Sequence, residues 1–250
     1  MRIASTAVAG LILALGVMSG RAADPAFPKV TPTKARDGKA IFQTVCAQCH
    51  GAAGEGREDL KSPSIASLPV WYLGSQFASF RGGRRGHDPA DTQAFMMATV
   101  AKSLQPQQLK AVAAHVAKMP RVIPAGKARD VDAANPESGM QLFREYGMEC
   151  HRYNGSVELA FGSPPLVGLH AWYLEAQLGK FKAGKRGAIK GDINGTKMTE
   201  VMDTFITEDR MVRDLVAYIM TLNPSRMPQG KNGDWLRLSV ASYWRGDRVA

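Results

Sequence analysis

The 250-residue chain repeats itself, because a shift of 101 positions aligns its first half with its second without a gap. The run Trp71-Tyr72-Leu73 falls on Trp172-Tyr173-Leu174, and the apolar positions around it coincide as well. Further along, the offset becomes 103 and pairs Ala114-His115-Val116 with Ala217-Tyr218-Ile219. A match of this length and order indicates two copies of one structural unit. We therefore expect two similar domains in tandem.

The first copy carries a complete CxxCH motif, formed by Cys46, Cys49 and His50. This is the attachment signature for c-type haem. Two thiols on one helical turn can reach the two vinyl groups of one porphyrin, and the adjacent histidine is then carried beneath the iron. The alternative is a redox CxxC of the thioredoxin type. That alternative requires a preceding strand in a βαβ unit, and the sequence pattern predicts neither.

The second copy keeps Cys150 and His151 but has Gly147 where the first copy has Cys46. Arg152 also stands where the first copy has Gly51. Three interpretations are open. A second haem is attached through Cys150 alone, or haem is loosely bound or absent and the unit serves docking, or the glycine is a variant of an ordinary dihaem protein. The remaining motif residues stay in register, which favours a bound second haem.

The N-terminal segment 1–22 has the pattern of a secretory signal peptide. It contains a positive residue, Arg2, a short apolar run and a small-x-small sequence at Gly20-Arg21-Ala22. The apolar run is too short to span a bilayer comfortably, so an uncleaved anchor is the weaker alternative. Export to the periplasm suits c-type haem. The three cysteines all fall within the haem motifs, so a disulfide framework is not expected.

The formal net charge is +10, and it falls to +8 if the signal segment is removed. A basic surface of this kind favours redox partners with an acidic docking surface, or an anionic membrane face. The basic residues are spread along the chain, so nucleic acid is not an expected partner.

The periodicity of apolar residues predicts helices in both copies and no convincing strand. The expected helices share their positions between the copies: 37–48 with 137–149, 69–81 with 170–182, and 106–118 with about 208–221. The fold class is therefore all-α. A Pro- and Gly-containing linker at 120–136 separates the copies.

These features together resemble the tandem dihaem class I cytochromes c, especially the c-four type. The resemblance rests on CAQCHG, Pro63-Ser64-Ile65, WYLGSQF, the Gly83 to Arg85 turn, Met97 and the helix at 106–118. It implies two small helical haem-binding domains, at 33–119 and 137–224. It also implies haem c as cofactor, bound covalently by Cys46 and Cys49 and, in the second copy, by Cys150.

The resemblance further implies histidine–methionine ligation of each iron, with His50 and His151 as proximal ligands. Met97 pairs with Met198 in the repeat, whereas Met96 pairs with Lys197, so Met97 and Met198 are the expected sixth ligands. Met202 is the second candidate in the second copy. Such ligation raises the potential and fills both axial positions of the iron.

By the same resemblance, the carbonyls of Pro63 and Pro164 orient the two proximal histidines. Arg85 and Arg186 are expected to pair with haem propionates, or else to lie in a solvated basic turn. Trp71, Tyr72, Trp172 and Tyr173 are expected to pack haem edges or the interface. The remaining histidines, His87, His115 and His170, are expected to be structural or exposed.

The function expected from these residues is that of a periplasmic carrier of single electrons rather than an enzyme. The alternative is a cytochrome subunit of a periplasmic or membrane-associated dehydrogenase or oxidase complex. A haem peroxidase is the weakest hypothesis, since it needs a displaceable axial ligand and a distal acid–base group. The C-terminal extension, 225–250, mixes Trp235 and Trp244 with arginines and could dock a partner or a membrane surface, or fold back on the domains.

Overall fold

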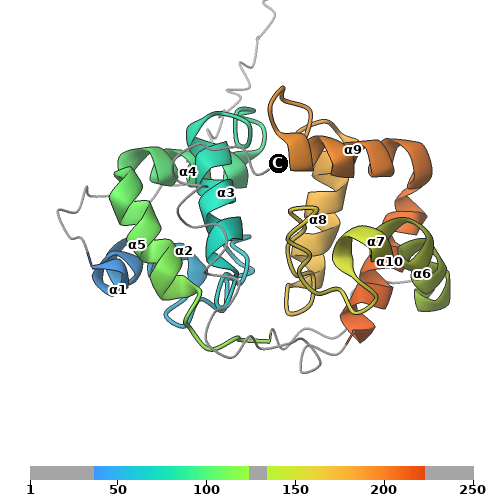
Figure 1. Ribbon diagram of the computed structural model, residues 1–250, viewed down its shortest axis with the longest axis horizontal. Helices are drawn as coiled ribbons and strands as arrows, with labels where there is room; N and C mark the ends of the chain where they lie inside the picture. Colours follow the sequence, from blue (N-terminus) through green and yellow to red (C-terminus); the bar gives the residue numbers. More distant parts are fainter. Residues whose placement is uncertain (1–36, 124–133, 223–250) are drawn as a thin grey trace, which may run out of the picture.

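The computed structural model describes residues 37–123, called unit 1 below, and residues 134–222, called unit 2. The regular elements in these ranges are helices, with two isolated backbone bridges at equivalent places in the two repeats. Figure 1 shows the helices as two bundles side by side, one from each repeat. The expected all-α fold of two tandem units is confirmed.

Both units contain the same sequence of elements. In unit 1 these are α1 (Gly38–Ile41), η1 (Phe42–Cys46), α2 (Ala47–His50), α3 (Val70–Arg81), α4 (Thr92–Ser103) and α5 (Pro106–Val116). In unit 2 they are α6 (Pro136–Leu142), η3 (Phe143–Gly147), α7 (Met148–His151), α8 (Ala171–Lys182), α9 (Ile193–Phe205) and α10 (Asp209–Thr221).

The first three elements of each unit form one continuous helical segment whose central part is a π-helix. In unit 1 the π-helix ends at Cys46, and in unit 2 it ends at Gly147. Such π turns occur frequently at functional sites. Because both units have the turn, it does not depend on the first cysteine of the motif.

Short polar side chains begin several of these helices. Asp37 accepts a hydrogen bond from Lys39 N at α1, and Asn135 accepts from Glu137 N and Ser138 N at α6. Asparagine and aspartate are preferred at this position because their side chains satisfy backbone N–H groups that have no helical partner. These caps fix where each haem-motif helix starts.

Two equivalent glycines allow the first and last helices of each unit to cross closely. A Cβ on Gly38 would collide with the carbonyl of Ala111 in α5, and a Cβ on Gly139 would collide with that of Asp214 in α10. The match between these glycines in the repeat therefore has a packing cause. The crossing brings the haem-motif helix against the helix that closes the unit.

Each unit has its own hydrophobic core. The most buried side chains of unit 1 include Ile41, Phe42, Leu104 and Leu109, and those of unit 2 include Phe143, Met202, Ile206 and Val216. Separate cores are what two independent domains require. Helices α3 and α8 face each other between the two bundles in Figure 1, and hydrogen bonds from Arg85 and Arg186, in the turns after them, join the units.

The structure agrees with the expected helices at 69–81, 170–182 and 106–118 to within two residues at each end. It adds α4 and α9, for which no helix was predicted, although they carry Met97 and Met198. Asp91 and Asp192, which cap these two helices, are the signal that could have revealed them.

Some expectations concern parts of the chain outside the described residues. These are the signal peptide at 1–22, the C-terminal extension at 225–250, most of the linker at 120–136, and the outer ends of the domains at 33–119 and 137–224. Within the described ranges, no helix combines the length and apolar character needed to cross a bilayer.

Candidate functional site

The first site lies at the end of the haem-motif helix of unit 1. Cys46 ends η1, and Cys49 and His50 follow in α2. The Nδ1 atom of His50 is 2.8 Å from the carbonyl oxygen of Pro63. Because a carbonyl can only accept, Nδ1 carries the proton and Nε2 keeps a free lone pair. Burial lowers the pKa of His50, against the opposing effect of the Pro63 bond, so the ring is held in its neutral, ligating form.

The second site repeats this arrangement in unit 2. The Nδ1 atom of His151 is 3.1 Å from the carbonyl oxygen of Pro164, again thirteen residues along the chain. Burial lowers the pKa of His151 to about 4, although the Pro164 bond acts in the other direction. The imidazole is therefore neutral at physiological pH, with Nε2 available as a ligand.

One cavity brings the expected ligands of unit 1 together. Cys46, Cys49 and His50 line it together with Met96 and Met97 of α4, and its volume is about 540 Å³. Cavities that hold cofactors are typically about 300–1,000 Å³. Both methionines line the cavity, so its lining alone does not choose between them. Met97 also packs against the core of unit 1, which holds that side chain in place.

The corresponding cavity of unit 2 is smaller, about 200 Å³. Gly147, Cys150 and His151 line it together with Met198 and Met202 of α9. Met202 is completely buried and belongs to the core of unit 2, whereas Met198 is only partly buried. This favours a packing role for Met202. Since the cavity is below the usual range for cofactors, a haem in unit 2 requires its lining side chains to move apart.

The thiols of both sites are partly buried. Burial, together with the neighbouring Cys49, raises the pKa of Cys46 to about 12. Burial also raises the pKa of Cys49 and of Cys150. All three sulfur atoms are therefore thiols at neutral pH in the absence of a reaction partner.

Gly147 adopts a backbone conformation that any residue can take, with φ −110° and ψ −33°. A Cβ added there would lie 3.0 Å from Cδ2 of Phe143. In unit 1, the equivalent Phe42 occupies the same place beside Cys46. The rings pack alike, since Phe143 lies 5.4 Å from Tyr218 and Phe42 lies 5.6 Å from His115. The glycine is thus not imposed by the backbone.

Arg85 and Arg186 lie in the contact between the units rather than on the surface. Arg85 is only 8% exposed, and it donates to Gln76 Oε1 at 2.6 Å and, across the interface, to Gln177 Oε1 at 2.8 Å. Arg186 donates to Gln177 Oε1 at 2.9 Å and across the interface to Gln76 Oε1 at 3.4 Å. For Arg85, the alternative of a solvated basic turn is wrong, because the turn is covered by the other unit.

The two tyrosines of the repeated helix complete this arrangement. Arg85 donates to the hydroxyl of Tyr173 at 3.3 Å, and Arg186 donates to that of Tyr72 at 3.5 Å. Burial acts to raise the pKa of Tyr173, but the charges of Arg85 and Arg186 outweigh it and hold the pKa below its usual value. Sequence reasoning missed that the glutamines and tyrosines bind these arginines across the interface.

The hydrogen-bond partners of Arg85 are therefore neutral oxygens, although the guanidinium is buried and positively charged. Arg85 lines both cavities, as do Gln76 and Gln177. A buried cation of this kind, next to a cavity with a histidine, cysteines and a methionine, fits a cofactor with carboxylate groups. The residues present are thus suited to haem and its propionates.

The other aromatic and histidine residues fall into two groups. Tyr72, Tyr173 and Trp172 lie at the interface, where Trp172 of unit 2 lines the cavity of unit 1, while Trp71 is buried. His87 is exposed, His115 packs on Phe42 and His170 packs on Trp172. Within residues 37–123 and 134–222, no cluster of three or more histidine, cysteine or acidic side chains could hold a free metal ion.

The comparison with protein families decides between the possible roles of these cysteines and histidines. The model described as "Cytochrome c" matches residues 35–120 and 136–223. This chain belongs to the cytochrome c family. Covalently bound haem c is the cofactor that this family implies, and the two matched stretches correspond to the two repeats of the cytochrome.

The cytochrome is also similar to proteins with two such domains. It is 31% identical over 195 residues to the "Thiosulfate dehydrogenase electron acceptor" of Thiomonas intermedia, covering 75% of this chain and 83% of that protein. The structure of reduced cytochrome c4 from Pseudomonas stutzeri matches with a TM-score of 0.57 and 25% identity, covering 74% of this chain and 97% of the other.

Thiosulfate dehydrogenase (TsdBA) from Marichromatium purpuratum matches with a TM-score of 0.58 and 26% identity. The match covers 80% of this chain and 45% of that one, so this cytochrome spans less than half of the longer protein. The similarity to the c-four type cytochromes is confirmed. The class of function is also confirmed: the protein is an electron-transfer cytochrome, and a place in an oxidoreductase complex fits as well.

Proposed function

We propose that this cytochrome carries single electrons between two redox partners in the periplasm through two haem c sites. In the first site Cys46 and Cys49 attach the haem, and His50 and Met97 ligate the iron. In the second site Cys150 alone attaches the haem, and His151 and Met198 ligate the iron. Haem c, when bound, supplies an iron that is reduced and oxidised by one electron.

The observation that carries this proposal is the repeated pair of histidine and proline. Each proximal histidine donates Nδ1–H to a proline carbonyl, at 2.8 Å in unit 1 and 3.1 Å in unit 2, and each faces a cavity that a methionine of α4 or α9 also lines. The carbonyl fixes the tautomer and the plane of the ring. Unit 2 keeps this geometry although it lacks the first cysteine, which supports a haem in both units.

The chain's own residues provide a short path between the two sites. The cavities share Gln76, Arg85, Tyr173 and Gln177 as lining residues, so a single layer of side chains separates them. Arg85 of that layer holds a positive charge next to both cavities, where it would pair with haem propionates, and Arg186 adds a second positive charge at the cavity of unit 2. The layer also keeps water away from the contact between the units, as the 8% exposure of Arg85 indicates.

The distribution of charge distinguishes the units as docking surfaces. Unit 1 has 10 lysines and arginines against 6 acidic residues, a net charge of +4, while unit 2 has 10 against 11, a net charge of −1. An acidic partner is therefore attracted to unit 1. The similarity to a thiosulfate dehydrogenase electron acceptor favours a dehydrogenase of that kind as electron donor, either in transient encounters or in a stable complex.

Haem content and redox behaviour test the proposal. Haem stoichiometry, by pyridine haemochrome analysis and intact mass of the exported protein, should give two haems per chain and an N-terminus after the signal segment. One haem per chain would overturn the role of unit 2. A redox titration should show two one-electron steps, and the reduced spectrum should not respond to carbon monoxide. Rapid turnover of peroxide would instead favour a peroxidase.

The alternative, a cytochrome subunit of a stable complex, is tested through the C-terminal extension. Deleting residues 229–250 should weaken binding to the partner if the extension docks it. Unchanged affinity with a lower melting temperature would show instead that the extension packs on the cytochrome itself.

A further inference from the structure

The two units cover each other's cavities with equivalent helices, and the cover is nearly symmetrical. Helix α3 lines the cavity of unit 2, and α8 lines the cavity of unit 1. The equivalent lining positions are Tyr72 and Tyr173, Ser75 and Ala176, Gln76 and Gln177, and Ser79 and Lys180. The last pair alone differs in charge. Unit 2 therefore places a lysine at the cavity of unit 1, where the opposite face offers only a hydroxyl.

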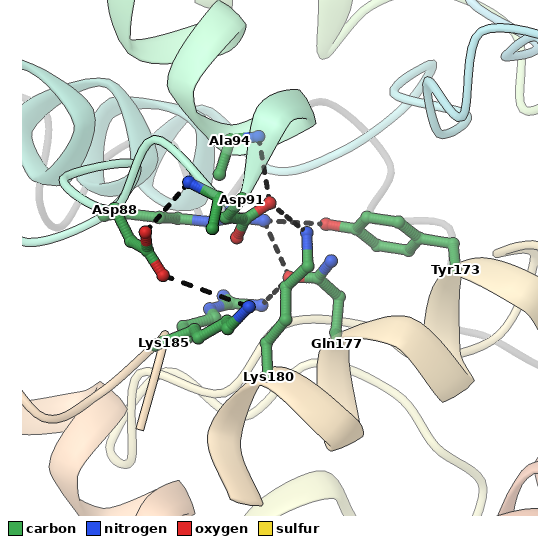
Figure 2. A network of polar contacts seen from close by, with 10 residues as sticks. Asp88, Asp91, Ala94, Tyr173, Gln177, Lys180 and Lys185 are labelled. Atoms are coloured by element: carbon green, nitrogen blue, oxygen red, sulfur yellow. Dashed lines mark hydrogen bonds and ion pairs between the residues drawn. The ribbon is translucent and has the colours of Figure 1, made fainter. Parts of the chain in front are cut away.

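Lys180 forms an ion pair with Asp91 of unit 1, and the Nζ and Oδ1 atoms are 2.6 Å apart. The side chain of Asp91 is 3% exposed and that of Lys180 is 20% exposed, so solvent screens the pair little. Figure 2 shows Lys180 reaching from α8 to Asp91, beside Tyr173 and Gln177. The more exposed pair of Lys185 with Asp88, at 3.9 Å, lies next to it and contributes less.

Asp91 has a second task, because it caps α4. The same Oδ1 atom that binds Lys180 accepts a hydrogen bond from Ala94 N at 3.3 Å, in the first turn of the helix. Met97 lies in the next turn of α4 and lines the cavity of unit 1. The ion pair thus ties the start of the methionine helix of one unit to the other unit.

Unit 2 lacks an equivalent tie. Asp192 caps α9 and accepts from Gly195 N at 3.2 Å, in the same way as Asp91. The residue of unit 1 at the position of Lys180 is Ser79, and the ion pairs found among the described residues include none of Asp192. Both caps are present, but only one is bound across the interface.

We propose that Lys180 is a positioning residue for the first haem site. Its ion pair with Asp91 holds the first turn of α4 against α8, and this keeps Met97 directed into the cavity of unit 1. Met198 in unit 2 has no support of this kind from unit 1. The proposal rests on the assignment of Met97 and Met198 as axial ligands under the proposed function.

The physical reason lies in the burial of the carboxylate. When a buried ion pair loses one partner, the other charge stays uncompensated in a site that excludes water. The free energy of the Asp91 carboxylate is then lower when the side chain turns toward solvent. In that position it no longer accepts the hydrogen bond that caps α4. A frayed first turn loosens the helix directly before Met97. Asparagine at position 91 separates the two tasks, because it keeps a good cap but removes the charge.

The test uses Lys180→Ser, which introduces the residue of unit 1, and Asp91→Asn in the haem-loaded protein. One matched control is Lys182→Ser, which removes a neighbouring lysine that pairs with Asp209 of its own unit. The other is Asp192→Asn, which changes the capping residue of α9 in unit 2. Added imidazole displaces methionine from each iron, and loss of the iron–methionine absorption band reports it. Hydrogen exchange of the first turns of α4 and α9 gives a second readout.

In Lys180→Ser and Asp91→Asn we expect half-displacement of the unit 1 methionine at about five- to tenfold lower imidazole concentration. Amide exchange in the first turn of α4 should be about tenfold faster in Lys180→Ser, whereas Asp91→Asn, which keeps the cap, should leave it near the native rate; α9 should be unchanged in both. The double variant, Lys180→Ser with Asp91→Asn, should lose methionine at no lower imidazole concentration than either single variant. Lys180→Arg should restore the native values. The two controls should match the native protein.

The proposal would be overturned if Lys180→Ser and Lys182→Ser behaved alike. It would also be overturned if imidazole displaced methionine with equal ease from both irons. Met97→Ala keeps this outcome separate from a failure of the ligand assignment. If Met97→Ala leaves both iron–methionine bands intact, the proposed function is wrong about the ligand. If it removes one band while Lys180→Ser has no effect, the ligand is right and the positioning role is wrong.

Discussion

Replacing Gly147 by cysteine should restore a complete haem attachment motif in unit 2. The backbone at Gly147 already has values that any residue can adopt. The new Cβ would lie 3.0 Å from the Phe143 ring, and ordinary contact begins at 3.4 Å, so the ring must move by about 0.4 Å. Crowding in a packed core typically costs about 1–3 kcal/mol. Removing a glycine from a helix returns about 0.5–1 kcal/mol, which offsets part of this cost, so the variant should still fold, with a melting temperature no higher than that of the native protein.

The assay compares haem attachment in the native protein and in Gly147→Cys. If Cys150 alone attaches the second haem, as proposed, that haem keeps an unreacted vinyl group in the native protein, and its haemochrome absorption should lie at longer wavelength than that of the haem in unit 1. In Gly147→Cys both haems should have two thioether bonds and a single common band. Denaturation followed by thiol alkylation should label no cysteine in the variant. Gly147→Ser is the control, since it adds similar volume without a thiol and should retain the native spectrum.

A free thiol would contradict this reasoning. If alkylation labels the new cysteine at 147 but not Cys150, the vinyl group does not lie beside this turn, and the geometry inferred from Cys46 does not carry over to unit 2. If it labels Cys150 as well, unit 2 binds no haem covalently. The same alkylation assay applies to the native protein, where labelling of Cys150 would exclude attachment of haem through one thioether.

Further substitutions separate iron ligation from packing and test the contact between the units. Met97→Ala and Met198→Ala should each lower the potential of one haem in a redox titration and abolish one iron–methionine absorption band, because methionine ligation raises the potential. Met202→Ala should keep both bands but cost about 2–5 kcal/mol in denaturant unfolding, since the side chain is fully buried; loss of a band would make Met202 the ligand. Arg85→Ala should cost about 1.5–3 kcal/mol because it removes the charge-assisted hydrogen bonds to Gln76, Tyr173 and Gln177, whereas Arg57→Ala, at an exposed ion pair, should leave the melting temperature unchanged.

The sequence was enough to predict the all-α class, the two units and most helix positions, because these depend on local periodicity and on the repeat. The His50–Pro63 contact was expected from the family resemblance, and the repeat register placed its copy in unit 2, where the structure has both bonds. The close helix crossing at Gly38 explains why the repeat keeps a glycine there.

Helices α4 and α9 were not predicted from the pattern of apolar residues. Their start is marked instead by the capping side chains of Asp91 and Asp192. The environment of Arg85 could not be read from the sequence either. It depends on which face of α3 meets α8, and that contact joins residues about 90 positions apart. Local patterns contain no information on such a contact.

The differences between the two copies separate what the fold needs from what each site needs. Where both copies agree for a steric reason, as at Gly38 and Gly139, the packing of the unit requires the residue. Where they differ while the same helical elements form, as at Cys46 and Gly147, the fold tolerates either residue. The π-helix and the phenylalanine beside it form with or without the cysteine, so a glycine at position 147 requires no other structural change in unit 2. Changes at such positions can therefore alter one redox site while the other site and the common fold stay as they are.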